Sequence, residues 1–384
     1  MIRLAGGSVA VIRDGAVCFE KKDIWLDPGL NLIIQQPSDL SGIAVETVDC
    51  SGKFITPGFF DSHIHGCFGV DISDASAEDI VRMSEELAAC GICAFLPTTM
   101  TLPEDRIREV LQAVSDAVDL LENMTAPHAD IPGVHLEGPF LNPEQAAAQN
   151  KDCLIPPDID LIHSLEKDYP GLIKIIDIAP ELDGADEFCR EFAGRYVLSA
   201  AHTTADYGTA LDFFARGGSS VTHMLNAMEP CLKRAPGIQG AAYDCSDVFV
   251  ELICDGFHIE PPVLRMLFGL FEGRIVIVSD SMSAAGMPDG KYELGGAEVE
   301  VRNGRTYGGS DGRLAGSVTL VTEAAQKLYS YGIKRESILD ALIYVPYKRL
   351  GMTPPMLLPG ERADVNILAE DLRLVKVISG GRVV

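Results

Sequence analysis

Short apolar runs recur through the middle of the chain, and most gaps between them have the period of a helix. Ser76–Ala89 and Glu104–Leu121 are the clearest helical gaps. Strands that alternate with helices pair in parallel, and eight such units predict a (β/α)8 TIM-like barrel of the α/β class. The eight runs are Phe59–His65, Ile92–Thr98, Ile131–Glu137, Leu172–Ala179, Tyr196–His202, Ser219–Met224, Val248–Asp255 and Ile275–Asp280.

The two ends of the chain have a different pattern. Short strands separated by glycine-containing turns fill the first fifty or so residues, and Val365–Val384 has the same character. We expect both ends to form one small β-sandwich domain from residues 1–56 and 358–384, with the barrel at 57–357. The glycine-rich segment after the eighth strand predicts a β-hairpin insertion at about residues 285–312.

The charge excludes two classes of partner. With 31 basic and 56 acidic residues the net charge is −25, so the surface repels nucleic acid and anionic membranes. No stretch reaches the roughly 18 apolar residues of a membrane span. Met1–Ala10 lacks the pattern of a secretory signal, and we expect a cytoplasmic protein. A phosphate-bearing substrate would need a few basic residues to reverse the local field.

Ten cysteines are scattered through apolar stretches, as is usual for reduced cytosolic thiols. Cys90 and Cys93 form a CxxC, which can be a redox site or half of a zinc site. The sequence has no second CxxC, and this one lies between a predicted helix and an apolar strand. We therefore interpret the pair as buried structural thiols.

Polar residues collect at the predicted carboxyl ends of the barrel strands, where barrel enzymes place their active sites. Residues two apart on a strand share a face, so the imidazoles of His63 and His65 can converge on one ion. His202 and His223 end neighbouring strands. Imidazoles with carboxylates at one mouth suit zinc or iron(II). The full set at strand ends is His63, His65, Glu137, His202, His223, Asp255 with His258 just beyond it, and Asp280.

Each residue of this set also has a simpler interpretation. A single histidine at a strand end is more often structural, and an aspartate there often caps the next helix. Five of the eight histidines share this placement, however, which capping does not explain. Of the others, His128 and His163 are expected to be solvated, and His135 is a candidate partner that supports the site.

These residues lie in motifs that resemble the amidohydrolase superfamily and, more specifically, its N-acetylglucosamine-6-phosphate deacetylases. The opening run with the HxH pair is general to the superfamily. The HLEGPF and HxxNAM segments are specific, and the order of the motifs matches across residues 57–317. The matching segments are Pro57–Gly66, His135–Leu141, Thr222–Met228, Asp255–His258, Val278–Asp280, Leu314–Ser317 and the tail Gly360–Asp364.

The resemblance implies roles for individual residues. Glu137, His202 and His223 would bind the principal divalent metal, zinc or iron(II), and His63 and His65 would help to hold a second, giving one or two per subunit. Asp280 would be the catalytic acid and base. Groups that would hold the phosphosugar substrate are Asn226, the Ala227 backbone, Arg234 and His258. The resemblance also implies a homodimer, in which the neighbouring chain reaches the phosphate.

The sequence departs from the family pattern in places. Gln149 stands where relatives commonly carry a histidine that polarises the acetyl carbonyl, and a glutamine amide donates a hydrogen bond without a charge. Ala201 replaces the usual glycine before His202. Most amidohydrolases supply a carboxylated lysine from the fourth strand, but Lys174 lies near the beginning of that run. Glu137 in a metal-bridging role is consistent with that absence.

Two other functions compete with this interpretation. The substrate could be N-acetylgalactosamine 6-phosphate, or another N-acyl compound or cyclic amide. A barrel can also serve as a non-catalytic scaffold, but such proteins usually lose metal ligands or the acid and base, and this sequence keeps both.

Overall fold

Eight parallel strands form the centre of the computed structural model, which describes residues 1–308 and 314–384. The sheet order follows the chain, so each strand pairs with the next, as in a (β/α)8 barrel. The predicted barrel is confirmed. Its strands are β8 (Phe59–Ile64), β11 (Ile92–Thr99), β12 (Val134–Phe140), β13 (Ile173–Ile178), β14 (Val197–Ala200), β15 (Gly218–Val221), β16 (Phe249–Ile253) and β17 (Ile275–Val278).

The barrel closes where the chain beyond β17 meets β8. The Asp280 amide donates a hydrogen bond to the His63 carbonyl at 2.9 Å, and the His65 amide donates to the Ser281 carbonyl at 2.9 Å. Ile64 and Ser281 also form a parallel bridge. The last strand therefore brings Asp280 directly beside the two histidines of the first.

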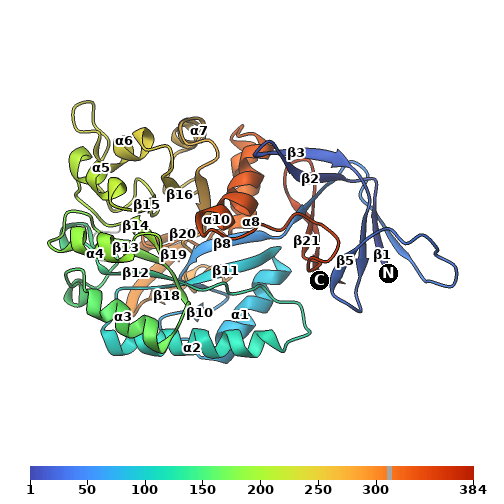
Figure 1. The fold of residues 1–384 in the computed structure, drawn as a ribbon, viewed down its shortest axis with the longest axis horizontal. Helices are drawn as coiled ribbons and strands as arrows, with labels where there is room; N and C mark the ends of the chain where they lie inside the picture. Colours follow the sequence, from blue (N-terminus) through green and yellow to red (C-terminus); the bar gives the residue numbers. More distant parts are fainter. Residues whose placement is uncertain (309–313) are drawn as a thin grey trace.

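Helices surround the barrel (Figure 1). The predicted helices at Ser76–Ala89 and Glu104–Leu121 are confirmed to within one residue at each end. Ser76 starts the first as its N-cap, because its hydroxyl accepts the Asp79 amide at 3.2 Å. The helices are α1 (Ala77–Ala89), α2 (Glu104–Glu122), α3 (Ile159–Asp168), α4 (Ala185–Phe192), α5 (Tyr207–Ala215), α6 (Gly237–Asp244), α7 (Pro261–Leu270) and α8 (Val321–Ser330).

The floor of the barrel is covered by a broken helix. It runs through α9 (Arg335–Leu339), a π-helical turn at Asp340–Tyr344 and α10 (Val345–Arg349). Tyr347 of this helix is buried among apolar side chains of the barrel interior. Its ring centroid lies 4.8 Å from that of Phe60. None of the helices in the described ranges has the length and apolar character that crossing a bilayer requires.

Both ends of the chain contribute to a pair of sheets beside the barrel, at the right of Figure 1. The two sheets share an apolar core that includes Leu4, Val9, Leu26, Ile55 and Ile367. The exact domain boundaries remain a prediction. One sheet contains β5 (Leu32–Ile34), β4 (Ile24–Asp27), β1 (Ile2–Ala5) and β6 (Glu46–Asp49), and the other contains β23 (Arg382–Val383), β22 (Leu374–Ser379), β21 (Val365–Leu368), β7 (Phe54–Pro57), β2 (Ser8–Arg13) and β3 (Ala16–Lys21).

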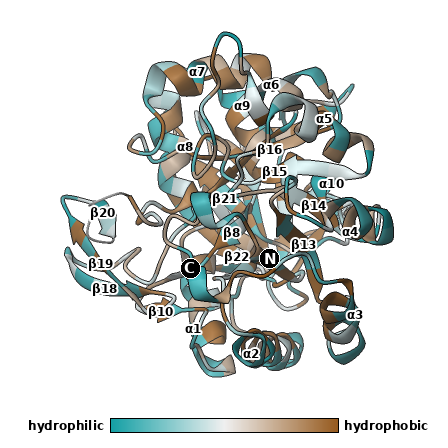
Figure 2. Cartoon of the chain, turned by 90° about the vertical axis from the view of Figure 1, so that its left-hand side faces the viewer, coloured by the Kyte–Doolittle hydropathy of each residue, from teal (hydrophilic) through white to brown (hydrophobic). Residues whose placement is uncertain are grey.

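The insertion after β17 has three antiparallel strands where the sequence predicted a two-stranded hairpin: β18 (Gly290–Leu294), β19 (Ala297–Arg302) and β20 (Arg305–Gly308). The second turn is Asn303-Gly304, whose φ angles of 52° and 69° fit a two-residue hairpin connection. Residues 309–312 of the predicted insertion lie outside the described residues. Figure 2 shows this sheet, hereafter the flap, at one edge of the molecule.

The CxxC pair was predicted to be buried, but Cys90 and Cys93 are both only partly buried. Their environment is still that of structural thiols. Burial raises the pKa of the Cys90 thiol to about 11, and it raises the pKa of Cys93 still further. Redox-active and metal-binding cysteines need a readily formed thiolate. The raised pKa of both thiols therefore disfavours either role.

Candidate active site

Several site residues lie just beyond the strands rather than at their last positions, contrary to the sequence prediction. β14, β15 and β17 each end two residues before His202, His223 and Asp280. The φ angles of these residues are 43°, 27° and 47°, so the chain leaves the extended conformation before it reaches them. From these positions His202 and His223 contact Glu137, and Asp280 contacts His65.

The third strand also differs from its prediction. β12 begins after Pro132 and Gly133, since proline has no amide hydrogen for the ladder, and it continues to Phe140. Glu137 therefore lies inside the strand, where the pairing with β13 is irregular between Leu136 and Phe140.

Glu137 is the centre of a cluster of buried side chains. The other members are His63, His65, His202, His223 and Asp280. Its Oε1 lies 3.0 Å from His202 Nε2 and 2.9 Å from His223 Nε2. Its Oε2 lies 3.0 Å from His65 Nε2 and 3.8 Å from His63 Nε2. Each carboxylate oxygen thus faces one pair of imidazoles.

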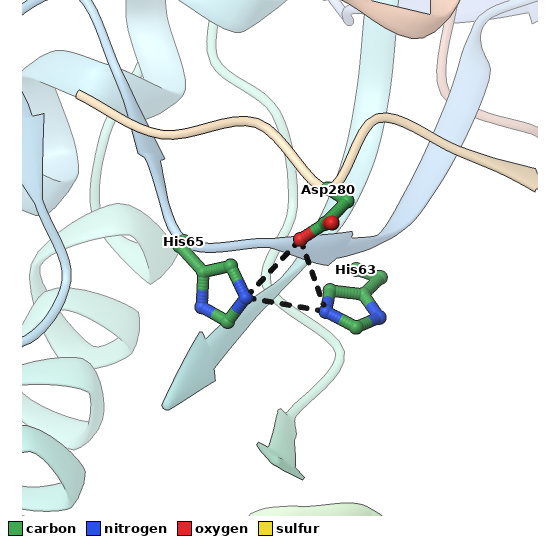
Figure 3. A group of neighbouring side chains, drawn as sticks. All are labelled: His63, His65 and Asp280. Atoms are coloured by element: carbon green, nitrogen blue, oxygen red, sulfur yellow. Dashed lines mark hydrogen bonds and ion pairs between the residues drawn. The ribbon is translucent and has the colours of Figure 1, made fainter. Parts of the chain in front are cut away.

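His63, His65 and Asp280 form the second half of the cluster (Figure 3). The two Nε2 atoms lie 3.3 Å apart, and Asp280 Oδ1 lies 3.6 Å from His63 Nε2 and 3.3 Å from His65 Nε2. Burial lowers the pKa of His65, but its hydrogen bonds to Asp280 and Glu137 raise it more, to about 9. The carboxylates of Glu137 and Asp280 therefore favour a positive charge beside His65.

Hydrogen bonds orient an imidazole in each half of the cluster so that its free nitrogen can bind a cation. His65 Nδ1 lies 3.2 Å from the Thr98 carbonyl and His202 Nδ1 lies 2.7 Å from the Gln145 carbonyl. A carbonyl only accepts, so Nδ1 carries the hydrogen and Nε2 offers its lone pair. These two lone pairs face the two oxygens of Glu137, an arrangement that a divalent ion would stabilise.

A cavity of about 350 Å³ opens over the cluster. Its lining includes the predicted substrate-binding residues Gln149, Asn226, Ala227 and His258 together with Asp280. The flap and the loop after β12 form part of its wall, through Leu294 and Ala148 among others. The structure thus brings together most of the predicted site.

Two of the lining residues are held in place by hydrogen bonds. Gln149 Nε2 donates to Glu137 Oε2 at 2.7 Å, and Gln149 Oε1 accepts the Thr101 amide at 2.7 Å. His258 Nδ1 lies 2.7 Å from Asp255 Oδ2. Burial raises the pKa of Asp255, but His258 and two backbone amides lower it more, so its carboxylate orients His258.

Arg234 is the exception among the predicted residues. It lies exposed in a turn after β15, in which Leu232 and Ala235 pair with each other. It is not among the described residues that line the cavity. Within one chain, therefore, Arg234 does not reach the site that the other residues form.

A layer of buried polar residues lies beneath the site. His135, which the sequence indicated as a supporting partner, belongs to it, with Nε2 2.9 Å from Asp177 Oδ1 and its ring 4.6 Å from that of His63. Glu251 and Arg349 form a fully buried ion pair in the same region. This ion pair was not predicted, although a charged residue, Glu251, in the middle of the apolar run of β16 was a signal for it.

Comparisons with known proteins agree with this geometry. The profile of the amidohydrolase family matches residues 54–266. N-acetylglucosamine-6-phosphate deacetylase from Bacillus subtilis (strain 168) is 35% identical over 335 residues, which cover 86% of this chain and 84% of that protein. N-acetylgalactosamine-6-phosphate deacetylase from Escherichia coli O157:H7 is 28% identical, covering 92% of this chain and 94% of that protein.

A solved structure shares the whole architecture. It is a mutant of N-acetyl-D-glucosamine-6-phosphate deacetylase from Mycobacterium smegmatis in complex with N-acetyl-D-glucosamine-6-phosphate. Its TM-score is 0.88 at 25% identity, and the match covers 100% of this chain and 98% of that one. Proteins of this kind generally use a divalent metal, for which the present chain has suitable histidine and carboxylate groups. The chain belongs to the amidohydrolase family.

Proposed function

We propose that the protein hydrolyses N-acetylglucosamine 6-phosphate to glucosamine 6-phosphate and acetate, as a cytoplasmic enzyme of amino-sugar catabolism. The observation that carries the proposal is the position of Glu137, which lies between two pairs of imidazoles with Asp280 beside it under one cavity. The relatives named for this reaction support the substrate.

The metal site is proposed as zinc or iron(II), with Glu137, His202 and His223 holding one ion. His63 and His65 would hold a second with Glu137 as the bridge. A divalent ion held by these residues would supply a Lewis acid for the acetyl carbonyl and would lower the pKa of water toward about 7. Every donor in the set is an imidazole nitrogen or a carboxylate oxygen, the ligands that these ions prefer.

Asp280 is the proposed acid and base. As water attacks the acetyl carbon, Asp280 would accept its proton and then deliver a proton to the sugar nitrogen, because an unprotonated amide nitrogen is a poor leaving group. Asp280 is buried and lines the cavity. Burial raises the pKa of Asp280, but the imidazoles of His65 and His63 lower it more, so it begins the reaction as a base.

Gln149 would donate a hydrogen bond to the developing oxyanion. We expect Gln149→Ala to lower kcat by roughly 10²–10³-fold, the usual effect of losing one such donor. Steady-state kinetics at saturating substrate measure this effect, and Gln112→Ala on the outer helix α2 is a control with the same chemical change away from the cavity. An unchanged kcat would remove Gln149 from the reaction and leave it only as a support for Glu137.

Arg234 is the proposed phosphate ligand, delivered by the partner chain of a homodimer. Arginine binds phosphate through a bidentate fork, and this one is exposed on an otherwise acidic protein. We expect Arg234→Ala to raise KM for the phosphosugar by about tenfold or more, since a hydrogen bond to a charged group contributes roughly 1.5–3 kcal/mol.

The same substitution should leave KM for unphosphorylated N-acetylglucosamine nearly unchanged, and Lys233→Ala is the matched control for surface charge. Equal effects on both substrates would disconnect Arg234 from the phosphate.

The decisive experiment measures acetate release from N-acetylglucosamine 6-phosphate and metal content on the same purified sample. The substrate panel also includes N-acyl amino acids and N-acetylgalactosamine 6-phosphate. The second epimer is included because one relative is named as a deacetylase of that compound. A higher kcat/KM for the galacto epimer would change the assigned substrate, and no acetate release from a metal-loaded sample would overturn the deacetylase proposal.

A further inference from the structure

A salt bridge lies in the core of the barrel, below the proposed metal ligands. Arg349 Nη1 donates to Glu251 Oε1 at 2.5 Å, and Arg349 Nη2 donates to Ser62 Oγ at 2.7 Å. The side chains of Glu251 and Arg349 are both completely buried. Replacing such a pair by apolar side chains often does not lower stability, so burial alone gives no reason for its presence here.

The free oxygen of the carboxylate contacts two proposed metal ligands at once. Glu251 Oε2 lies 3.0 Å from His63 Nδ1 and accepts the His223 backbone amide at 3.3 Å. His63 belongs to one half of the metal cluster and His223 to the other. A single oxygen atom therefore fixes an imidazole in one half and the backbone of a ligand in the other.

These contacts also decide which nitrogen of His63 can bind a metal. An ionised Glu251 only accepts, so Nδ1 of His63 carries the hydrogen and Nε2 presents its lone pair toward Glu137 and Asp280. Without an acceptor at Nδ1, the opposite tautomer would place a hydrogen where the cation should lie.

A further metal site beneath the proposed metal ligands does not explain why Glu251 lies beside His63. His63, His135 and Glu251 have ligand atoms close to one another. His135, however, has both nitrogens in hydrogen bonds, with Nδ1 3.2 Å from the Ser62 carbonyl and Nε2 2.9 Å from Asp177 Oδ1. It has no lone pair left to offer a further ion at this level.

We propose that Glu251 and Arg349 are positioning residues that set the tautomer of His63 and the backbone of His223, and thereby the affinity for the second metal. Arg349 reaches Glu251 from the barrel floor, so α10 supports the metal centre from below. This inference rests on the proposed function, because it assumes that His63 binds a metal.

The test compares two double variants, because a single substitution would leave one buried charge without its partner. Glu251→Leu with Arg349→Met removes both charges and the acceptor of His63 Nδ1. Glu251→Gln with Arg349→Met removes both charges but keeps a neutral acceptor. Ser84→Ala is the stability control. Ser84 lies on α1, outside the barrel strands, and the substitution removes its buried hydrogen bond of 2.7 Å to the Ala129 carbonyl.

The measurement is a zinc titration of metal-stripped protein against a chromophoric chelator, with thermal unfolding of the metal-free forms recorded in parallel. Wild-type protein should bind two zinc ions. The leucine variant should bind one of them about 10–100-fold more weakly, the range for lost supporting contacts. The glutamine variant should lose less, and Ser84→Ala should bind both as wild type does.

Equal binding of both ions in all variants would overturn the inference while leaving the proposed deacetylase intact. So would a loss in Ser84→Ala as large as that in the leucine variant, or a single zinc ion in wild type, which would show that His63 is no ligand. A wild-type protein that bound no zinc or iron and released no acetate would instead overturn the proposed function itself.

Discussion

Asp280→Asn is expected to lower turnover of N-acetylglucosamine 6-phosphate by roughly 10²–10⁴-fold, the contribution that general acid–base catalysis usually makes. Asparagine has nearly the shape of aspartate but can neither accept the proton of the attacking water nor return it to the nitrogen. The side chain lies 3.3 Å from His65 and 3.6 Å from His63, so its removal acts directly at the reacting centre.

The measurements are kcat, zinc content and the Kd of the substrate by calorimetry. The substrate and the ion proposed at Glu137, His202 and His223 should bind nearly as in wild type, which separates the loss of the proton carrier from the loss of the site. Asp183→Asn makes the same chemical change at an exposed loop position and should have no effect. Near-normal turnover of Asp280→Asn would remove this residue from the mechanism.

Glu137→Gln is expected to be more damaging, with activity reduced more than about 10⁴-fold, beyond the range of acid–base catalysis alone. Both oxygens of Glu137 face imidazole nitrogens, at 2.9 Å to His223 and 3.0 Å to His65. A glutamine would present an N–H group on one side and a neutral oxygen on the other. It would therefore weaken both proposed metal sites.

Metal content per chain and kcat/KM measured on the same sample test this expectation. Metal should fall to less than half of the wild-type content. Glu144→Gln removes a carboxylate from the cavity wall without touching the cluster, and it should retain metal. Full metal content in Glu137→Gln would contradict the bridging role of this residue.

The barrel and the identity of most of the cluster were predictable from the sequence, because both depend on local patterns. Apolar runs of strand length reveal β8 and its neighbours, and the parallel arrangement places their carboxyl ends on one rim. The position of the turn into left-handed backbone at His202 and His223 was not predictable, since an apolar run gives no sign of where its pairing ends.

Contacts between distant segments were the other limit. Glu251 and Arg349 are 98 residues apart, and only the path of α10 under the barrel brings them together. The location of Arg234 outside the cavity is likewise a property of the folded loop, since its neighbours in the sequence, Asn226 and Ala227, do line the cavity. Patterns along the chain do not contain this information.

The left-handed backbone at His202, His223 and Asp280 also matters for anyone who engineers this enzyme. This conformation disfavours most side chains, and glycine would adopt it with less strain. Selection of variants for heat resistance alone would therefore favour glycine in place of these side chains. Stability would rise and activity would be lost, which is the usual trade-off between the two. A library of variants designed to raise thermal stability should therefore keep these three positions fixed and vary the outer helices instead.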